Sequence, residues 1–449
     1  MKNVNFRKTK TIYFIGIGGI GISAVARMFL LEGKKVSGSD VAEGEVTEGL
    51  QKVGAKIFIG QRAENVPAKC DLVIYTIAVP PDNPEFAEAK RRGISMMSYP
   101  EALGEISRDK FTIAVSGTHG KTTTTAMIAK ILVDAELDPT VIVGSFINLC
   151  TKSVDIRCPQ NCRHQMSTER TNFISGRGKY FVVEACEYRR SFLHLSPRGL
   201  VLTNIDADHL DYYKDMNDII SAFNELATKV PKSGFVVTDA KNRNIKLALK
   251  NVKSKISDYK QQTTSYRLKI PGQHNILNAQ AALAVSKILG IEEKSAIRSL
   301  ENFSGTWRRF EYRGKAKNGA LVYDDYGHHP TEIEATLAGA RELFPKQKIV
   351  VVFQPHLYSR TKDHLKAFGK CFKDANEVIL LPIYPAREKN PGNINSEMVV
   401  AEIKKNNQPT FFAKDFADAA SRAVSLTKAG DLILTLGAGE TNKVADILV

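Results

Sequence analysis

Long apolar runs are missing from this sequence of 449 residues, and cysteines are few. It contains no stretch of about 18 uninterrupted apolar residues, so we expect no membrane-spanning helix. Four glycines break the apolar run between residues 11 and 22, and no small-residue cleavage site closes it, so we expect no secretion signal. The six cysteines are scattered, which favours a reduced cytoplasm over a disulfide framework.

A basic block with interleaved aromatic residues is also missing, although the formal net charge is +15. Charge of this sign permits nucleic-acid binding, but the lysines are spread along the chain. This distribution favours an enzyme with phosphorylated substrates, and we expect no nucleic-acid partner. The 43% hydrophobic and 25% charged residues are ordinary for a soluble globular protein, and the length predicts about two to four domains.

The stretch from Thr112 to Ile128, TIAVSGTHGKTTTTAMI, has the order of a phosphate-binding loop. A β-branched run predicts a buried strand, a glycine turn follows, and a helix is expected from Lys121. Backbone N–H groups at the start of a helix point at an anion, Lys121 can reach the β- and γ-phosphates, and the Thr122 hydroxyl can bind Mg²⁺. Because Val115 stands where a further glycine is usual, the loop is a short GxxGKT form. A chance glycine turn before a helix is the alternative to an ATP site. The predicted ATP-site residues are Gly117, Thr118, His119, Gly120, Lys121, Thr122 and Thr123.

Residues 11–40 predict a strand, a glycine turn, a helix and a second strand that ends in Asp40. Gly16, Gly18 and Gly21 form a GxGxxG pattern, whose glycines let the backbone approach a pyrophosphate at a helix N-terminus. The pattern selects a nucleotide diphosphate, UDP as well as NAD, so an NAD-dependent dehydrogenase stays an alternative on this pattern alone. A strand at 71–75 and a loop at 76–85 continue the unit, and residues 98–101 and 107–110 are predicted to form a linker.

Carboxylates follow two predicted strands of the second unit, which begins near Phe111. Glu184 ends the strand 180–183 and is well placed for Mg²⁺. The strand 200–205 is followed by a polar run that contains Asp206, Asp208, His209 and Asp211. Three carboxylates this close repel one another unless a cation or another partner is present, so this run favours a cation site over a solvated loop.

The stretch from Cys150 to Gly178 is polar and irregular, and we expect an exposed loop there. It contains Cys150, Cys158, Cys162 and His164. These residues lack the second ligand pair of a zinc site, so we favour a solvated insertion over a metal centre and assign the stretch no function.

Two further polar clusters could contact a nucleotide. His274 and Asn275 open an alanine-rich helix and could hold a purine edge, although Asn275 could equally cap that helix. Arg308 and Arg309 are adjacent in the run GTWRRFE and would suit the charge on a transferring phosphoryl group.

The third unit, from about Tyr312, repeats a strand followed by a polar loop four times. The predicted strands are 320–323, 348–353, 377–381 and 431–436. The carboxyl ends of parallel strands meet at one edge of a sheet, so these loops predict an α/β sheet with a site at that edge.

Across its whole length the chain resembles the Mur ligase family, and within it the alanine-adding members. The resemblance is carried by GIGGIG, GTHGKTTTT, EACEYRRSFL, TNIDADHLD, GQHNILNAQAA, GTWRRFE, DDYGHHPTEIEATL, FQPHLYSRT, IYPAREKNPG and LTLGAGE. It implies an α/β fold of three domains: a Rossmann-like N-terminal domain for a UDP-sugar (1–108), a central P-loop ATPase domain (109–312) and a Rossmann-like C-terminal domain for an amino acid (313–449).

The resemblance also implies residue roles. Three residues would be catalytic. Lys121 and Arg309 would contact the phosphates of ATP, and His328 would lie beside the amino-acid site. Nucleotide binding would add His274, Asn275 and Asn278 at the adenine and Asp325 near the ribose. The implied UDP-sugar residues are Gly16, Gly18, Gly19, Ile20, Gly21, Asp40 and Thr76. The amino-acid carboxylate would be held by His356 and Arg360, and Tyr326 is a further expected substrate-binding residue. The implied metal ligands are Thr122, Glu184 and His209.

The implied reaction is an ATP- and Mg²⁺-dependent ligation of L-alanine to UDP-N-acetylmuramate. Several sister ligases use a carbamylated lysine where this chain has about Asn224, and asparagine there is typical of the alanine-adding branch. A related ligase that adds a preformed peptide or another amino acid stays an alternative, as does a nucleic-acid-stimulated ATPase.

Overall fold

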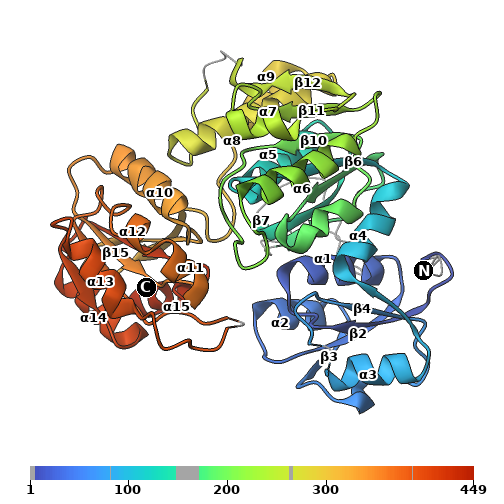
Figure 1. Ribbon diagram of the computed structural model, residues 1–449, viewed down its shortest axis with the longest axis horizontal. Coiled ribbons are helices and arrows are strands. Elements are labelled where there is room, and N and C mark those ends of the chain that lie inside the picture. The colour runs from blue at the N-terminus through green and yellow to red at the C-terminus, as the bar shows by residue number, and fades with distance from the viewer. Residues whose placement is uncertain (1–5, 81, 148–170, 262–265, 387) are drawn as a thin grey trace. The chain divides into compact units, whose positions relative to one another are not determined.

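The structure is a computed structural model that describes residues 6–80, 82–147, 171–261, 266–386 and 388–449. It contains three β-sheets with α-helices packed on them (Figure 1). The chain divides into two compact units, of which the first comprises residues 1–205, 220–262 and 281–299 and the second comprises 206–219, 263–280 and 300–449. Within the described residues, no helix has the length and apolar character needed to cross a membrane.

The first sheet is parallel throughout and lies in the first unit. Its strands run in the order β3 (Lys56–Ile59), β2 (Lys35–Asp40), β1 (Thr11–Ile15), β4 (Leu72–Tyr75) and β5 (Ser95–Ser98). The central strand β1 is buried from Ile12 to Ile15, as expected of a strand covered on both faces. The helices of this part are α1 (Ile20–Leu31), α2 (Glu45–Lys52), α3 (Pro84–Arg91) and α4 (Tyr99–Arg108), with a 3₁₀ turn at Ala63–Asn65.

The linker predicted at 98–101 and 107–110 is wrong, because helix α4 occupies this stretch. Ser98 and Glu101 form a capping box, in which the Glu101 carboxylate accepts the Ser98 N–H at 2.6 Å and the Glu101 N–H donates to the Ser98 hydroxyl at 3.4 Å. Pro100 lies in the first turn, where its missing N–H costs no helical hydrogen bond. The polar residues at both ends therefore cap a helix whose middle is buried.

The second sheet also lies in the first unit and surrounds the predicted phosphate loop. Its strands run in the order β12 (Lys255–Asp258), β11 (Phe235–Thr238), β10 (Gly199–Leu202), β6 (Phe111–Ser116), β9 (Tyr180–Glu184), β7 (Thr140–Ile147) and β8 (Thr171–Ile174). Helices α5 (Lys121–Asp134) and α7 (Arg243–Ala248) and 3₁₀ turns at Tyr188–His194 and Tyr259–Gln261 belong to the same unit. Helices α6 (Met216–Thr228), α8 (Gln273–Ile288) and α9 (Glu293–Glu301) contain residues of both units.

Strand β8 corrects the irregular loop predicted for 150–178. Residues 171–174 pair antiparallel with β7, and Asn172, Phe173 and Ile174 are buried. The Asn172 side chain donates to the Ile20 carbonyl and, at 2.9 Å, to the Ser23 hydroxyl, which ties β8 to α1. The four residues Cys150, Cys158, Cys162 and His164 lie outside the described residues.

The third sheet lies in the second unit. Its strands run in the order β13 (Glu311–Lys315), β14 (Leu321–Asp325), β18 (Leu432–Leu436), β15 (Ile349–Phe353), β16 (Glu377–Leu380) and β17 (Thr410–Phe412). Strands β14 to β18 are parallel, and β13 is antiparallel to β14. The four predicted strands of this unit are confirmed to within two residues as β14, β15, β16 and β18.

Two apolar layers cover the third sheet, and successive residues of β15 alternate between them. Ile349, Val351 and Phe353 pack with residues of α10 (Pro330–Leu343), α12 (Leu365–Phe368) and α13 (Ser396–Lys404). Val350 and Val352 pack with residues of α14 (Phe416–Ser425) and α15 (Asn442–Leu448). Both faces are thereby buried, and the carboxyl ends of the strands are left to carry polar loops.

A buried ion pair joins the segment before β13 to strand β14 of the third sheet. The Arg308 guanidinium, 4% exposed, donates to the fully buried Asp324 carboxylate at 2.7 Å. It also donates to the carbonyls of Gly437 at 2.6 Å and Gly439 at 2.8 Å. Both charges are therefore paired and hydrogen-bonded, which burial requires.

Removing one partner of this pair should destabilise the fold. Arg308→Met leaves the Asp324 carboxylate buried without its cation, and we expect a loss of about 3–5 kcal/mol in unfolding free energy. Urea unfolding followed by circular dichroism measures this loss. The matched control, Arg309→Met at the neighbouring, less buried arginine, should change stability by less than about 1 kcal/mol. Equal losses in the two variants would contradict the structural role of Arg308.

Candidate active site

The predicted phosphate loop is a glycine turn between β6 and α5. Gly117 has φ +130° and Gly120 has φ +83°, backbone conformations that side chains with a Cβ rarely adopt. Helix α5 begins at Lys121, directly after the second glycine. The first N–H groups of a helix have no partner within the helix, so this turn directs backbone donors and the positive end of the helix dipole to one place.

Two residues after strand β10 hold the turn in place. The Asn204 side chain accepts the His119 N–H at 2.9 Å, and the Asn204 carbonyl accepts the Thr118 N–H at 3.1 Å. The Thr203 hydroxyl donates to the His119 carbonyl at 2.6 Å. A Cβ at Gly117 would lie 2.1 Å from the Thr203 hydroxyl oxygen, so only glycine fits. Sequence reasoning assigned no role to Thr203 or Asn204 because it placed both inside a predicted strand, 200–205, whereas β10 ends at Leu202.

Lys121 is folded over the turn. Its ammonium group donates to the Gly117 carbonyl at 2.6 Å and the Thr118 carbonyl at 2.9 Å, and it pairs with the buried Glu187 carboxylate at 2.9 Å. Burial opposes the charged form, but the negative charges of Glu187 and Glu184 outweigh it and raise the pKa of Lys121 above its ordinary value. Lys121 is therefore a fixed cation at the mouth of α5.

Thr122 and Glu184 lie next to Lys121 and provide two oxygen atoms that could bind a metal ion. The Thr122 hydroxyl donates to the Glu184 carboxylate at 3.0 Å, and the second carboxylate oxygen accepts the Gly144 N–H at 2.8 Å. Hydroxyl and carboxylate oxygens are the ligands that Mg²⁺ prefers, so the donor set fits the implied ion. The third predicted ligand, His209, belongs to the second unit, and its metal role stays a prediction.

The GxGxxG turn lies between β1 and α1 and is fastened to the end of β2. The Asp40 carboxylate accepts the Gly18 N–H at 2.8 Å, and the Ser39 carbonyl accepts the Gly16 N–H at 2.9 Å. Thr76 follows β4, and its methyl group lies where a Cβ at Gly16 would be, at 2.4 Å. The structure thus brings together the predicted UDP-sugar residues Gly16, Gly18, Gly19, Ile20, Gly21, Asp40 and Thr76 at the carboxyl ends of β1, β2 and β4.

In the second unit, the predicted adenine residues lie at the start of α8. The Asn275 side chain donates to the Pro271 carbonyl at 2.7 Å, so Asn275 closes the first turn from within the helix and is not its N-cap. The Asn278 side chain donates to Asn275 at 3.4 Å. Burial and then the charge of Arg309 lower the pKa of His274 to about 4, so its imidazole is neutral at pH 7.

The two adjacent arginines both lie over the ring of Tyr326, at 5.3 Å for Arg308 and 5.1 Å for Arg309, but they differ in burial and pairing. Arg308 is buried and committed to Asp324, whereas Arg309 is only partly buried. Of the two, Arg309 is thus the one available to a ligand. The predicted ribose residue Asp325 is buried and accepts the N–H groups of Phe310 at 2.8 Å and Gly327 at 2.7 Å, and burial raises its pKa to about 6. Its contacts position the backbone on both sides of β14.

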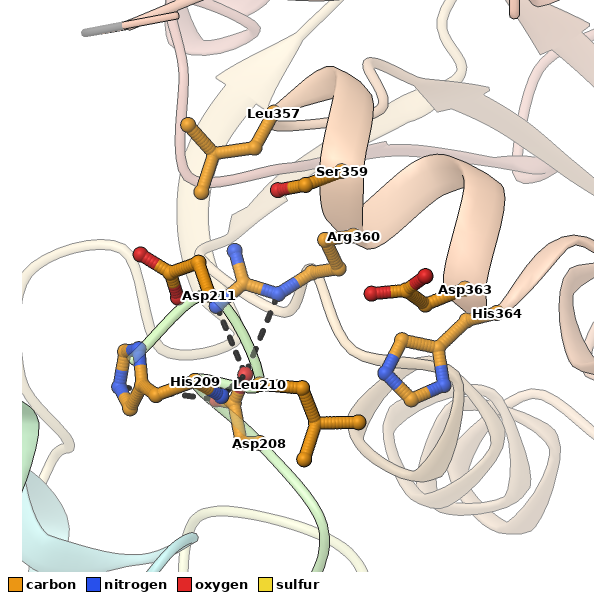
Figure 2. A pocket seen from close by; sticks show the side chains of 9 residues that line it. All are labelled: Asp208, His209, Leu210, Asp211, Leu357, Ser359, Arg360, Asp363 and His364. Atoms are coloured by element: carbon orange, nitrogen blue, oxygen red, sulfur yellow. Dashed lines mark hydrogen bonds and ion pairs between the residues drawn. The ribbon is translucent and has the colours of Figure 1, made fainter. Parts of the chain in front are cut away.

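The predicted amino-acid residues Arg360 and His356 are in contact. Arg360 donates to the Asp208 carboxylate at 2.9 and 3.3 Å (Figure 2). Its remaining terminal nitrogen lies 3.2 Å from Nδ1 of His356. Burial disfavours the charged carboxylate, but His209 and Arg360 outweigh it and hold the pKa of Asp208 well below its usual range. The sequence predicts that the acidic run 206–211 needs a positively charged partner. For Asp208, that partner is Arg360.

A small pocket adjoins this ion pair and lies in the second unit (Figure 2). It is formed by residues of the acidic run and by residues of α11 (Tyr358–Asp363) and its flanks. Its lining residues are Asp208, His209, Leu210, Asp211, Leu357, Ser359, Arg360, Asp363 and His364. Of the predicted amino-acid residues, Arg360 lines this pocket and His356 does not.

His328 lies beside the amino-acid residues. Its ring is 5.8 Å from that of His356 and 5.6 Å from that of Tyr326, and its Nδ1 lies 3.1 Å from the Tyr326 carbonyl. Burial lowers the pKa of His328 to about 4, although the Glu332 charge opposes the shift. The imidazole is therefore neutral at pH 7.

Asn224, at the position of the carbamylated lysine of some related ligases, has structural contacts. Its side chain donates to the carbonyls of Ala248 at 2.8 Å and Lys250 at 2.7 Å. These bonds tie α6 to the end of α7.

The buried His274 should make the folded protein less stable in mild acid. Its pKa of about 4 in the folded state lies below the value of about 6.5 in the unfolded chain. Between these values the unfolded chain binds a proton that the folded protein excludes, so stability falls as the pH falls through this window. The loss for this group is about 2 kcal/mol between pH 7 and pH 5.

Urea unfolding at pH 7 and pH 5 measures this effect. His274→Gln should lose less stability than the wild type over this interval, whereas His194→Gln, at an exposed histidine, should behave as the wild type. If His274→Gln keeps the full wild-type loss, burial of the neutral imidazole is not the cause.

Three family models match consecutive parts of the chain. The Mur ligase family catalytic domain matches residues 11–111, the Mur ligase middle domain matches 115–265, and the glutamate ligase domain of Mur ligases matches 308–439. Among solved structures, a UDP-N-acetylmuramate–alanine ligase from Thermotoga maritima is 29% identical, with a TM-score of 0.77 over 98% of each chain. A murein peptide ligase from Psychrobacter arcticus, 24% identical over 98% of each chain with a TM-score of 0.73, shares the fold.

Two proteins named UDP-N-acetylmuramate–L-alanine ligase are each 41% identical to this chain. The one from Clostridium kluyveri matches 99% of this chain and 98% of its own length, and the one from Clostridium tetani matches 98% of both. Identity at this level over nearly the full length, together with the three domain matches, shows that the chain belongs to the Mur ligase family.

Proposed function

We propose that this protein joins L-alanine to the carboxylate of UDP-N-acetylmuramate with ATP, forming an amide, ADP and phosphate, as a cytoplasmic step of peptidoglycan synthesis. The glycine turn that directs Lys121 and the first N–H groups of α5 to one place carries the ATP-dependent part of this proposal. The choice of substrates is supported by the two relatives at 41% identity. We further propose domain boundaries at 1–108, 109–312 and 313–449.

The reaction proceeds in two transfers. An oxygen of the sugar-borne carboxylate attacks the γ-phosphorus of ATP, the bond to the β-phosphate oxygen breaks, and ADP leaves. The resulting acyl phosphate has a good leaving group, which a free carboxylate lacks. The amine of L-alanine then attacks the acyl carbon, and phosphate leaves from the tetrahedral intermediate.

The protein contributes mainly position and positive charge to the first transfer. Lys121, fixed over the turn, contacts the terminal phosphates, and Arg309 neutralises charge that develops on the transferred group. Thr122 and Glu184, with His209 as the ligand of a second ion, would hold Mg²⁺, which supplies Lewis-acid neutralisation of phosphate charge. His274, Asn275, Asn278 and Asp325 complete the nucleotide contacts.

The second transfer needs an oriented, deprotonated amine. Arg360 and His356 hold the amino-acid carboxylate, and Tyr326 lies beside His328. His328, whose ring lies beside that of His356, accepts the proton that the amine loses.

Phosphate release from ATP tests the function directly. We expect release when UDP-N-acetylmuramate and L-alanine are both present, and little release with other single amino acids or with a preformed tripeptide. Turnover with the tripeptide in place of L-alanine would identify a peptide-adding ligase. Stimulation by DNA or RNA in place of the sugar nucleotide would overturn the proposal.

Lys121→Ala should abolish ADP formation, with a loss of about 10³-fold or more in kcat, because a fixed cation at the terminal phosphates is removed. Binding of UDP-N-acetylmuramate, measured by calorimetry, should stay within about twofold of wild type. Lys130→Ala, at a surface ion pair of the same helix, is the control and should retain activity. Equal loss of ADP formation and sugar-nucleotide binding would count against the assigned role.

Arg360→Met should raise the KM for L-alanine by about tenfold or more, since a charge-assisted hydrogen bond to the substrate carboxylate is lost. The KM for ATP should change by less than about twofold. Arg422→Met, at an exposed arginine of α14, controls for loss of charge in the same unit. A larger change in the KM for ATP than for alanine would remove Arg360 from the amino-acid site.

A further inference from the structure

We propose that Glu388 is a positioning residue for the amino-acid site, which holds the first turn of α11 so that Arg360 and His356 keep their orientation. The inference rests on the proposed function, because it assumes that these two side chains hold the amino-acid carboxylate. Glu388 follows β16 and is far in sequence from α11, so it acts only through the fold.

Glu388 binds the residue directly before Arg360. One carboxylate oxygen accepts the Ser359 N–H at 3.0 Å, and the other accepts the Ser359 hydroxyl in a short hydrogen bond. Ser359 lies in the first turn of α11, whose N-cap Leu357 makes no side-chain capping bond. Glu388 therefore supplies from another loop the anion and acceptor that a helix start favours.

Tyr384, on the same loop as Glu388, holds the chain on both sides of His356. The Tyr384 ring stacks on the His356 ring, with centroids 5.7 Å apart and planes at 19°. The Tyr384 carbonyl accepts the Leu357 N–H at 2.9 Å, and the Tyr384 N–H donates to the Pro355 carbonyl at 2.8 Å. One loop thus fixes His356 by its ring and backbone and Arg360 through its neighbour Ser359.

The backbone between the two amino-acid residues needs this support. Leu357 has φ +69° and ψ 136°, a conformation that residues other than glycine rarely adopt. Such a conformation persists only where surrounding contacts enforce it, and it is common at sites that bind ligands. Glu388 and Tyr384 provide those contacts on either side of Leu357, and without them Arg360 would lose its alignment with His356, which lies 3.2 Å from it.

Steady-state kinetics of the full-length protein test the proposal. Glu388→Ala should raise the KM for L-alanine about tenfold, while the KM values for ATP and UDP-N-acetylmuramate change less than twofold. Glu388→Gln, which keeps one acceptor oxygen, should give a smaller rise and serves if the alanine variant does not fold. Glu397→Ala, at an exposed carboxylate of α13, is the control and should match the wild type.

Ser359→Ala isolates the contact, since it removes the hydroxyl and keeps the N–H. It should reproduce part of the rise seen for Glu388→Ala, and the double variant should show less than the product of the two single effects. A wild-type KM for L-alanine in both Glu388 variants, or a common change in all three KM values, would overturn the positioning role. If the wild-type protein did not turn over L-alanine at all, the proposed function would fail and this inference with it.

Discussion

The chemistry of this protein depends on one backbone constraint: the four residues between β6 and α5 must turn within a very short distance. The turn is possible because Gly117 and Gly120 adopt positive φ values and because Thr203 and Asn204, at the end of the neighbouring strand β10, occupy its remaining polar groups. With the turn fixed, Lys121 is directed over it, and α5 begins directly after it. Neighbouring parallel strands thus supply both the loop and the residues that hold it.

In the second unit the controlling factor is the pairing of charge near strand ends. Arg308 and Arg360 are both buried, and each is satisfied by a carboxylate, Asp324 and Asp208 respectively. Arg308 holds the sheet together, whereas Arg360 faces a pocket and keeps a nitrogen near His356. Two arginines with similar burial and similar carboxylate partners are thus placed differently, one within the sheet and one at a pocket.

Most strands and the glycine turns could be predicted from sequence because their signals are local: short apolar runs, positive-φ glycines and the polar residues that follow. The linker prediction failed because Ser98 and Glu101 are polar and suggest a loop. They are instead the capping box that begins helix α4. Strand β8 was missed because its pairing with β7 is decided by a distant segment. The sequence does not distinguish the adjacent Arg308 and Arg309, since Asp324, which pairs with Arg308 alone, belongs to a strand that follows later in the chain.

The strand order of the third sheet has a consequence for biogenesis. Strand β18 lies between β14 and β15, yet it comes after every other strand of that sheet along the chain. While a ribosome is still making the intervening residues, β14 and β15 each expose one unpaired edge, and β15 is the uncharged run IVVVF. Until its last strand is inserted, the nascent chain therefore exposes an aggregation-prone strand edge. Binding by chaperones would matter most during this interval.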